Sequence, residues 1–212
     1  MSAARFDPNC RACPRLAAHL DRVTETHPDY HARPVAAFGA ARPRLLIVGL
    51  APGMHGANRT GRPFTGDHAG ILLYQTLHDL GLASQQMGAA PDDGLRLLGC
   101  RITNAVKCLP PENKPTGQEI RRCNAYLRAE IAALPADAVV LALGAVAHRA
   151  VLMALDLPPS RFPFAHGKVH RLAPGRRLVD CYHCSRYNTQ TGRLTPIMFQ
   201  RALRRARDLA LN

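Results

Sequence analysis

The chain has 212 residues, of which 47% are apolar, so it can bury one substantial core, and we expect a single domain over residues 1–212. The formal net charge of +13 favours a polyanionic partner such as nucleic acid, although an arginine-rich composition can equally follow genome base content. No run approaches the roughly 18 apolar residues of a membrane span, and no signal peptide precedes the first cysteines, so we expect a cytoplasmic protein.

Helices and strands are expected to alternate along the chain. Apolar runs predict strands, and amphipathic spacing predicts helices, with Thr116 as the cap of the helix that starts at Gly117. In chain order, the expected elements are a helix over 15–23, a strand over 44–50, a helix over 69–81, a strand over 100–106, a helix over 117–134, a strand over 138–143, a helix over 145–155, a strand over 178–182 and a helix over 195–211. This order predicts an α/β fold, a three-layer α/β/α sandwich with a central, mostly parallel four-stranded sheet.

Long polar loops follow three of the predicted strands. Ligands bind at the carboxyl ends of parallel strands, so the loops after Leu50, Val106 and Tyr182 should meet at one crevice. The first loop is rich in glycine, which lets the backbone approach a ligand, and the last carries hydroxyls, amides and two arginines. Such a set suits phosphates and a polar heterocycle.

Two cysteine pairs have the spacing of a metal centre. Cys10 and Cys13 form C-x2-C, and Cys108 and Cys123 form C-x14-C, within a total of seven cysteines. A reducing compartment favours ligation over disulfides. Spacing alone does not separate zinc from an iron–sulfur cluster, and Cys108 and Cys123 could also be ordinary core residues. We assign no covalent chemistry to the other three cysteines.

Four segments carry specific motifs: C-x2-C-P-R-L at 10–16, GLAPGMHGANRTGRPFTGD at 49–67, TNAVKCLPPENKPT at 103–116 and YHCSRYNTQTGRLT at 182–195. Together they resemble the iron–sulfur uracil-DNA glycosylases of family 5, also called type b. The resemblance covers almost the whole chain and turns the cysteine set from zinc towards a [4Fe–4S] cluster held by Cys10, Cys13, Cys108 and Cys123.

The resemblance implies a DNA repair enzyme. Such an enzyme flips uracil out of single- or double-stranded DNA and hydrolyses its N-glycosidic bond, which leaves an abasic site and free uracil. Hypoxanthine, xanthine and ethenocytosine are further bases to expect as substrates. We also expect a monomer that associates with the nucleoid when it acts.

The resemblance also implies roles for residues around the base. His183 would donate a hydrogen bond to uracil O2 as negative charge develops there. Phe64 would stack on the extruded base, and Asn104 would recognise the uracil edge, because an amide both donates and accepts. The base site would be completed by three residues of the first loop, Gly49, Ala51 and Gly53.

The group that activates water is less clearly marked. Related families have an acid or an amide where this chain has Leu50 and Ala51. Asp67 resembles the residue proposed for this role, and the alternative is a helix N-cap, since a predicted helix follows it. Asn113 matches a family position near the substrate, with a turn residue as its alternative.

Polar residues of the loops are candidates for DNA contact, and each alone also fits a solvated surface position. They are Arg59, Lys114, Ser185, Arg186, Tyr187, Asn188 and Arg193, of which Tyr187 could enter the duplex where the base has left. Two rival functions are kept: an iron–sulfur DNA-damage-binding protein with weak or no excision, and a zinc-stapled hydrolase of small nucleotides.

Overall fold

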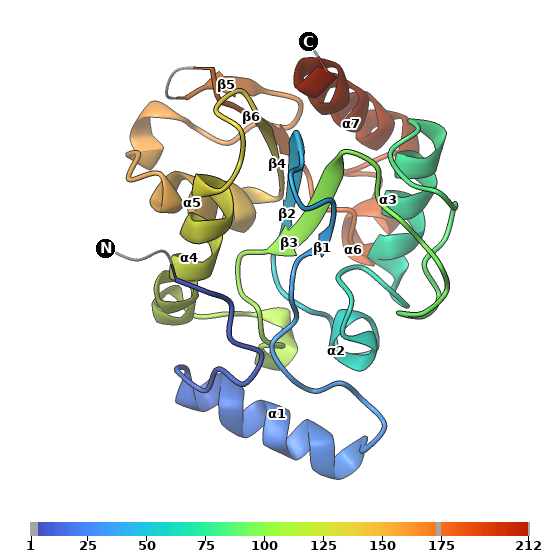
Figure 1. The fold of residues 1–212 in the computed structure, drawn as a ribbon, viewed down its shortest axis with the longest axis vertical. Helices are drawn as coiled ribbons and strands as arrows, with labels where there is room; N and C mark the ends of the chain where they lie inside the picture. The colour runs from blue at the N-terminus through green and yellow to red at the C-terminus, as the bar shows by residue number, and fades with distance from the viewer. Residues whose placement is uncertain (1–3, 173–174, 212) are drawn as a thin grey trace.

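A six-stranded sheet forms the centre of the computed structural model, which describes residues 4–172 and 175–211. The strand order is β1–β3–β2–β4–β6–β5 (Figure 1). The four inner strands run parallel: β2 (Leu45–Gly49), β3 (Cys100–Asn104), β4 (Val139–Leu143) and β6 (Arg177–Cys181). The two edge strands, β1 (Phe38–Gly39) and β5 (Val169–Arg171), are antiparallel to their neighbours.

The prediction of four strands is therefore wrong in number. The inner four are the predicted ones, each displaced by no more than two residues at either end. The edge strands have two and three residues, too few for an alternating pattern to stand out in the sequence. The sheet is mixed, although it is mostly parallel.

Helices cover both faces of this sheet. Alternate residues of β2 point to opposite sides: Leu45 and Ile47 belong to the cluster that contains α3 (His68–Asp79) and α7 (Pro196–Leu211) side chains. Leu46 and Val48 belong to the cluster with α4 (Gly117–Ala132) and α5 (Ala145–Ala154) side chains. Burial on both faces explains why the inner strands are continuous apolar runs. None of the helices in the described residues is long and apolar enough to span a bilayer.

The N-terminal helix α1 (Pro14–Thr26) lies below the sheet in Figure 1 and packs on the segment after β3. Its Leu16 and Leu20 share a buried cluster with Val106 and Leu109. An ion pair adds to this contact: Arg15 donates two hydrogen bonds, of 2.8 and 2.7 Å, to the carboxylate of Glu119 on α4. The first cysteine pair is thereby held beside the second.

Short helices interrupt two of the polar loops, and the sequence pattern did not predict them. They are α2 (Ala57–Thr60), and α6 (Arg186–Gln190), which Ser185 caps by accepting from the Asn188 N–H. Two 3-10 turns, η1 (Pro111–Asn113) and η2 (Pro159–Arg161), follow β3 and α5. Helices of four or five residues are too short to show a helical period. They nevertheless fold the long loops down over the carboxyl ends of the strands.

Candidate active site

A cavity of about 410 Å³ lies over the carboxyl ends of β2, β3 and β6. All three loops that were expected to converge contribute to it. Its lining residues are Leu50, Ala51, Gly53, Ala57, Phe64, Asp67, His68 and Ala69 from the first loop and α3, Asn104 and Asn113 from β3 and the loop after it, and His183, Ser185 and Arg186 from the last loop.

Gly49 does not line the cavity itself, but its lack of a side chain leaves two lining residues, Asn104 and Phe64, in place at the cavity floor. Gly49, the last residue of β2, is paired with Asn104, the last residue of β3. A Cβ atom on Gly49 would lie 2.4 Å from Asn104 Oδ1 and 2.8 Å from the Phe64 ring. No larger residue fits without displacing one of these two side chains.

Asn104 presents an acceptor that has no partner. The residue is only 3% exposed, and its Oδ1 accepts no hydrogen bond from any of the described residues. Leaving a buried polar atom unpaired costs about 1–3 kcal/mol. Such an atom at the edge of a cavity is suited to a ligand that brings an N–H donor.

Phe64 is held in a strained backbone conformation. Its φ is +55°, in the left-handed region that bulky residues rarely adopt. The turn is locked by the start of α3, because a Cβ on Gly70 would lie 1.8 Å from the Phe64 carbonyl oxygen. Strain of this kind persists where the surrounding structure enforces it, commonly at functional sites. The result is a ring that lies against the cavity.

His183 lies beside the Phe64 ring, and both residues line the cavity. The two ring centroids are 6.0 Å apart, and the planes are inclined by 28°. Desolvation lowers the pKa of His183 to about 4, so the imidazole is neutral at pH 7. Its backbone oxygen accepts a 2.8 Å hydrogen bond from Asn188 Nδ2. The amide of Asn188, predicted as a DNA contact, is thus engaged inside the loop.

Asp67 is a helix cap and also a cavity residue. Its Oδ1 accepts a 2.8 Å hydrogen bond from the Gly70 N–H and caps α3. Burial raises the pKa of this carboxyl, and the Gly70 hydrogen bond opposes the rise. The helix N-cap is therefore confirmed, and Asp67 also lines the cavity, while its role towards water stays a prediction. Asn113 reaches the cavity rim from η1, with a φ of +57°.

Most predicted DNA contacts lie at the surface around the cavity. Arg186 lines it, while Arg59 donates to the His55 carbonyl oxygen at 2.9 Å. Lys114 is paired with Glu112 at 3.0 Å, and both side chains are more than three-quarters exposed. Tyr187 is 70% exposed, and the Arg193 guanidinium lies 4.7 Å from the centre of the Tyr182 ring.

The four predicted ligand cysteines line a second cavity, of about 220 Å³, between α1, α4 and the loop after β3. The backbone N–H of Lys107 donates to Cys123 Sγ at 3.3 Å, a contact that suits a thiolate ligand. Four thiolates around one zinc ion, with bonds of about 2.3 Å, would lie only about 3.8 Å apart.

The sulfur atoms are more widely spaced than zinc requires. Among the described residues, one group of three or more potential ligands has all its donor atoms within 4.8 Å of one another, and that group is His148, His170 and Asp180. No three of the four cysteine sulfurs meet this limit.

His68 is a cavity residue that the sequence interpretation missed. Its Nε2 lies 3.1 Å from Thr189 Oγ1, so it joins the start of α3 to α6 across the cavity rim. The only signal in the sequence was its place beside Asp67. Leu50, Ala57 and Ala69 were not selected either, because apolar lining residues resemble core residues in a sequence.

Comparison with known proteins assigns the family. The family model described as the uracil DNA glycosylase superfamily matches residues 36–207, and the chain belongs to this superfamily. A type-5 uracil-DNA glycosylase of Thermus thermophilus is 48% identical over 206 residues, which cover 95% of this chain and 94% of the relative. A type-5 enzyme of Mycobacterium tuberculosis is 44% identical, with 95% of this chain and 78% of the relative covered. A type-4 uracil-DNA glycosylase of Thermotoga maritima is 34% identical over 139 residues, 65% of this chain and 58% of the relative.

Proposed function

We propose that the chain is a type-5 uracil-DNA glycosylase that flips uracil out of DNA and hydrolyses its N-glycosidic bond without cutting the strand. The unpartnered Oδ1 of Asn104 is the observation that carries this proposal. Uracil offers an N–H on the edge that would face Asn104, whereas the floor at Gly49 leaves room for a flat ring. The similarity to type-5 relatives over 95% of the chain supports the same activity.

His183 would stabilise the leaving group. Cleavage leaves positive charge on the sugar and negative charge on the departing uracil. A neutral imidazole can donate an N–H to uracil O2 as that charge grows, and this interaction is stronger in the transition state than in the ground state. The low pKa of His183, about 4, keeps the ring in the neutral form that this role needs.

Asp67 and Asn113 would serve the sugar side of the reaction. The Asp67 carboxylate can orient water or offset the charge of an oxocarbenium-like transition state. Its cap hydrogen bond to Gly70 fixes the carboxylate at the cavity. Asn113, which also lines the cavity, would help to position the water or the sugar through its amide.

A [4Fe–4S] cluster is the group that best suits the cysteine-lined cavity. Cys10, Cys13, Cys108 and Cys123 would hold it, and their spacing beyond that of a zinc site supports this choice. When bound, the cluster would supply a covalent link between three segments of chain: the N-terminal segment, the loop after β3, and α4. It would tie the N-terminal segment to the loop that carries Asn113. We also propose that the whole chain forms one domain and acts as a monomer.

DNA would lie across the cavity mouth. Exposed basic side chains there would contact phosphates, and Tyr187 would fill the gap left by the flipped base. Hypoxanthine, xanthine and ethenocytosine remain candidate substrates, since the rings fit the same stacking arrangement against Phe64. The proposed phosphate contacts are Arg59, Lys114, Arg186 and Arg193.

The test is excision from a U·G duplex, followed by alkali that breaks the strand at abasic sites. The parent protein should produce breaks, and His183→Ala should slow single-turnover excision by about 100-fold or more. His78→Ala, at the far end of α3, is the control and should excise at the parental rate. No breaks with the parent protein would favour a damage-binding protein without excision.

Asp67→Asn separates the two contacts of Asp67. Asparagine is as good an N-cap as aspartate, so α3 should fold normally while the negative charge is lost. We expect excision to slow by about 10- to 100-fold, with unchanged affinity for DNA. Unchanged kinetics would reduce Asp67 to a helix cap.

A further inference from the structure

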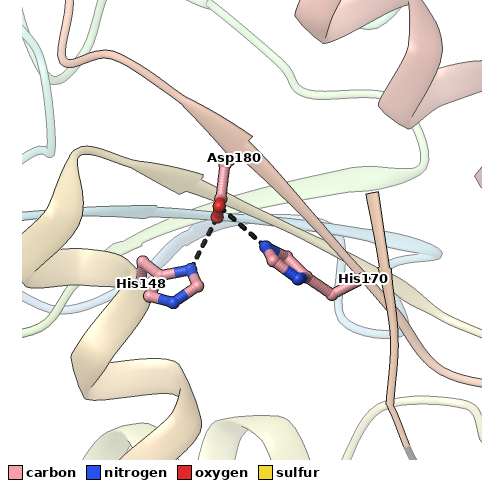
Figure 2. A group of neighbouring side chains, drawn as sticks. All are labelled: His148, His170 and Asp180. Atoms are coloured by element: carbon pink, nitrogen blue, oxygen red, sulfur yellow. Dashed lines mark hydrogen bonds and ion pairs between the residues drawn. The ribbon is translucent and has the colours of Figure 1, made fainter. Parts of the chain in front are cut away.

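We propose that His148, His170 and Asp180 form a second metal site, for one divalent transition-metal ion such as zinc. Figure 2 shows the two imidazole rings facing the two oxygens of one carboxylate. The three side chains come from three elements: α5, β5 and β6. None of them lines the cavity over the strand ends, where uracil would bind, or the cavity lined by the four cysteines. This inference therefore does not depend on the proposed function.

The spacing of the donor atoms fits a single ion. His148 Nδ1 lies 2.7 Å from Asp180 Oδ1, and His170 Nε2 lies 2.8 Å from Asp180 Oδ2. One donor atom from each residue lies within 4.8 Å of the other two. Zinc bonds to nitrogen and oxygen are about 2.1 Å, so the ligands of one tetrahedral ion lie about 3.4 Å apart, and the two contacts to Asp180 would lengthen by about 0.6 Å on binding. Two histidines and a carboxylate are a common ligand set for such ions.

The outer contacts of the group are those of metal ligands. The Nε2 atom of His148 lies 2.8 Å from the Phe162 carbonyl oxygen, which fixes a proton on Nε2 and leaves Nδ1 turned towards the carboxylate. Metal-bound histidines usually donate their other N–H to a carbonyl or carboxylate in this way. Asp180 Oδ2 also accepts a 3.1 Å hydrogen bond from the Ala165 N–H.

Both ring nitrogens of His148 face oxygen atoms inside the protein: Nδ1 faces Asp180 Oδ1, and Nε2 faces the Phe162 carbonyl oxygen. His148 is 1% exposed, His170 is 5% exposed and Asp180 is fully buried, so protein encloses the group. A divalent ion bonded to His148 Nδ1, His170 Nε2 and the carboxylate would leave the Nε2 contact with Phe162 in place.

The position of the group indicates what the ion would do. Asp180 lies three residues before His183 on the same strand and loop. The backbone oxygen of Asp180 accepts a 2.7 Å hydrogen bond from the Gly167 N–H. Two residues further on, the Tyr182 N–H donates a 3.1 Å hydrogen bond to His166 Nδ1. The ion would fasten the segment 162–170 to β6 and so support the loop that carries His183. Its role would be structural, because all three ligands are buried.

The test measures metal content in the full-length protein with its iron retained. The protein is exposed to zinc chloride, dialysed against a weak chelator, and assayed for zinc and iron by mass spectrometry. We expect about one zinc per chain in the parent and a loss of at least tenfold in Asp180→Asn and in His148→Gln. His166→Gln, a histidine change in the same segment that leaves the three ligands intact, should keep its zinc.

Two further measurements keep the test decisive. If a variant does not fold, the parent alone is melted with and without zinc; we expect zinc, but not magnesium, to raise the melting temperature by roughly 5 °C. Zinc on the cysteines is identified by Cys10→Ser/Cys13→Ser, which should lose iron yet keep the zinc held by the histidines. A parent without zinc, or equal zinc in parent and Asp180→Asn, would overturn the proposal. Uracil excision, assayed separately, decides the proposed function independently of zinc content.

Discussion

Gly49 shows how one missing side chain shapes the base cavity. Alanine there should slow uracil excision by about 100-fold, because its methyl group would overlap Asn104 Oδ1 and the Phe64 ring, at 2.4 and 2.8 Å. Single-turnover kinetics measure the effect, and affinity for undamaged DNA should not change. Gly117→Ala is the matched control, since its Cβ would meet only the Arg121 side chain, at 3.4 Å. A Gly49→Ala protein as fast as the parent would contradict this view of the cavity floor.

The pKa of His183 makes a second prediction at this scale. An ordinary histidine gains its proton near pH 6.5, whereas burial lowers the pKa of His183 to about 4. The ring should stay neutral as the pH falls from 8 to about 5, so the single-turnover rate should show no loss near pH 6.5 that depends on His183. The loss should come only as the pH approaches 4. If the single-turnover rate of the parent instead falls near pH 6.5, and this fall is absent in His183→Asn, then His183 does not act as a neutral donor with a lowered pKa.

The same low pKa bears on stability. The unfolded chain binds a proton at His183 near pH 6.5 and the folded chain does not, so the folded state loses stability as the pH falls from about 6.5 towards 4. Above pH 6.5 this contribution is constant. Thermal melts of parent and His183→Asn at several pH values would therefore diverge only on the acid side.

Motifs located the candidate residues from sequence, but not their geometry. The motif around Phe64 suggested a ring that stacks on a base. Nothing in the sequence predicts its left-handed φ of +55°, because phenylalanine rarely adopts that conformation. Asn104 was selected for its amide, yet its unpaired oxygen depends on the absence of neighbours from distant segments. For Asp67, the sequence suggested either a helix cap or a catalytic carboxylate. Only the structure shows that the residue caps α3 and lines the cavity at the same time.

At the scale of elements, Glu119 joins α1 to α4. It completes a capping box with Thr116 and accepts two hydrogen bonds from Arg15. These contacts, led by the Arg15 hydrogen bond, hold the pKa of Glu119 below its usual value. Their stabilisation is present above about pH 4.5 and is lost as the pH falls through the lowered pKa.

Glu119→Ala should therefore loosen the cysteine-lined cavity. We expect the free energy of unfolding to fall by about 2 kcal/mol, because the cap and a largely buried ion-pair partner are lost together. Iron of the proposed cluster should also leave the protein several-fold faster, as followed by the decay of visible absorbance. Glu25→Ala, an exposed change near the end of α1, is the control and should alter neither quantity. Equal iron retention in Glu119→Ala would contradict the link.

The long elements were predictable from sequence and the short ones were not. Strands such as β4, which is buried at every position, appear as apolar runs, and the N-cap Thr116 correctly indicated the start of α4. The edge strand β5 becomes visible only in the structure, through its pairing with β6. The same holds for α6, which Ser185 caps. Short elements depend on tertiary contacts, so their local sequence carries little signal.

For the whole molecule, the net charge of +13 should make DNA binding strongly dependent on salt. If four basic residues at the cavity rim each contact one phosphate, a plot of log K against log salt should have a slope of about −3.6. Arg186→Gln should reduce its size by about 1. Arg201→Gln, on α7, is the control and should leave it unchanged. An equal change in both variants would mean that the charge acts diffusely and not at the rim.

The most direct test of the base cavity is a crystal structure with a U·G duplex that carries a non-cleavable 2′-fluoro-2′-deoxyuridine. We expect the uracil to be flipped into the cavity with its ring stacked on Phe64, its N3–H donating to Asn104 Oδ1 and its O2 accepting from His183. A uracil that stays in the duplex, or that enters a different cavity, would contradict it.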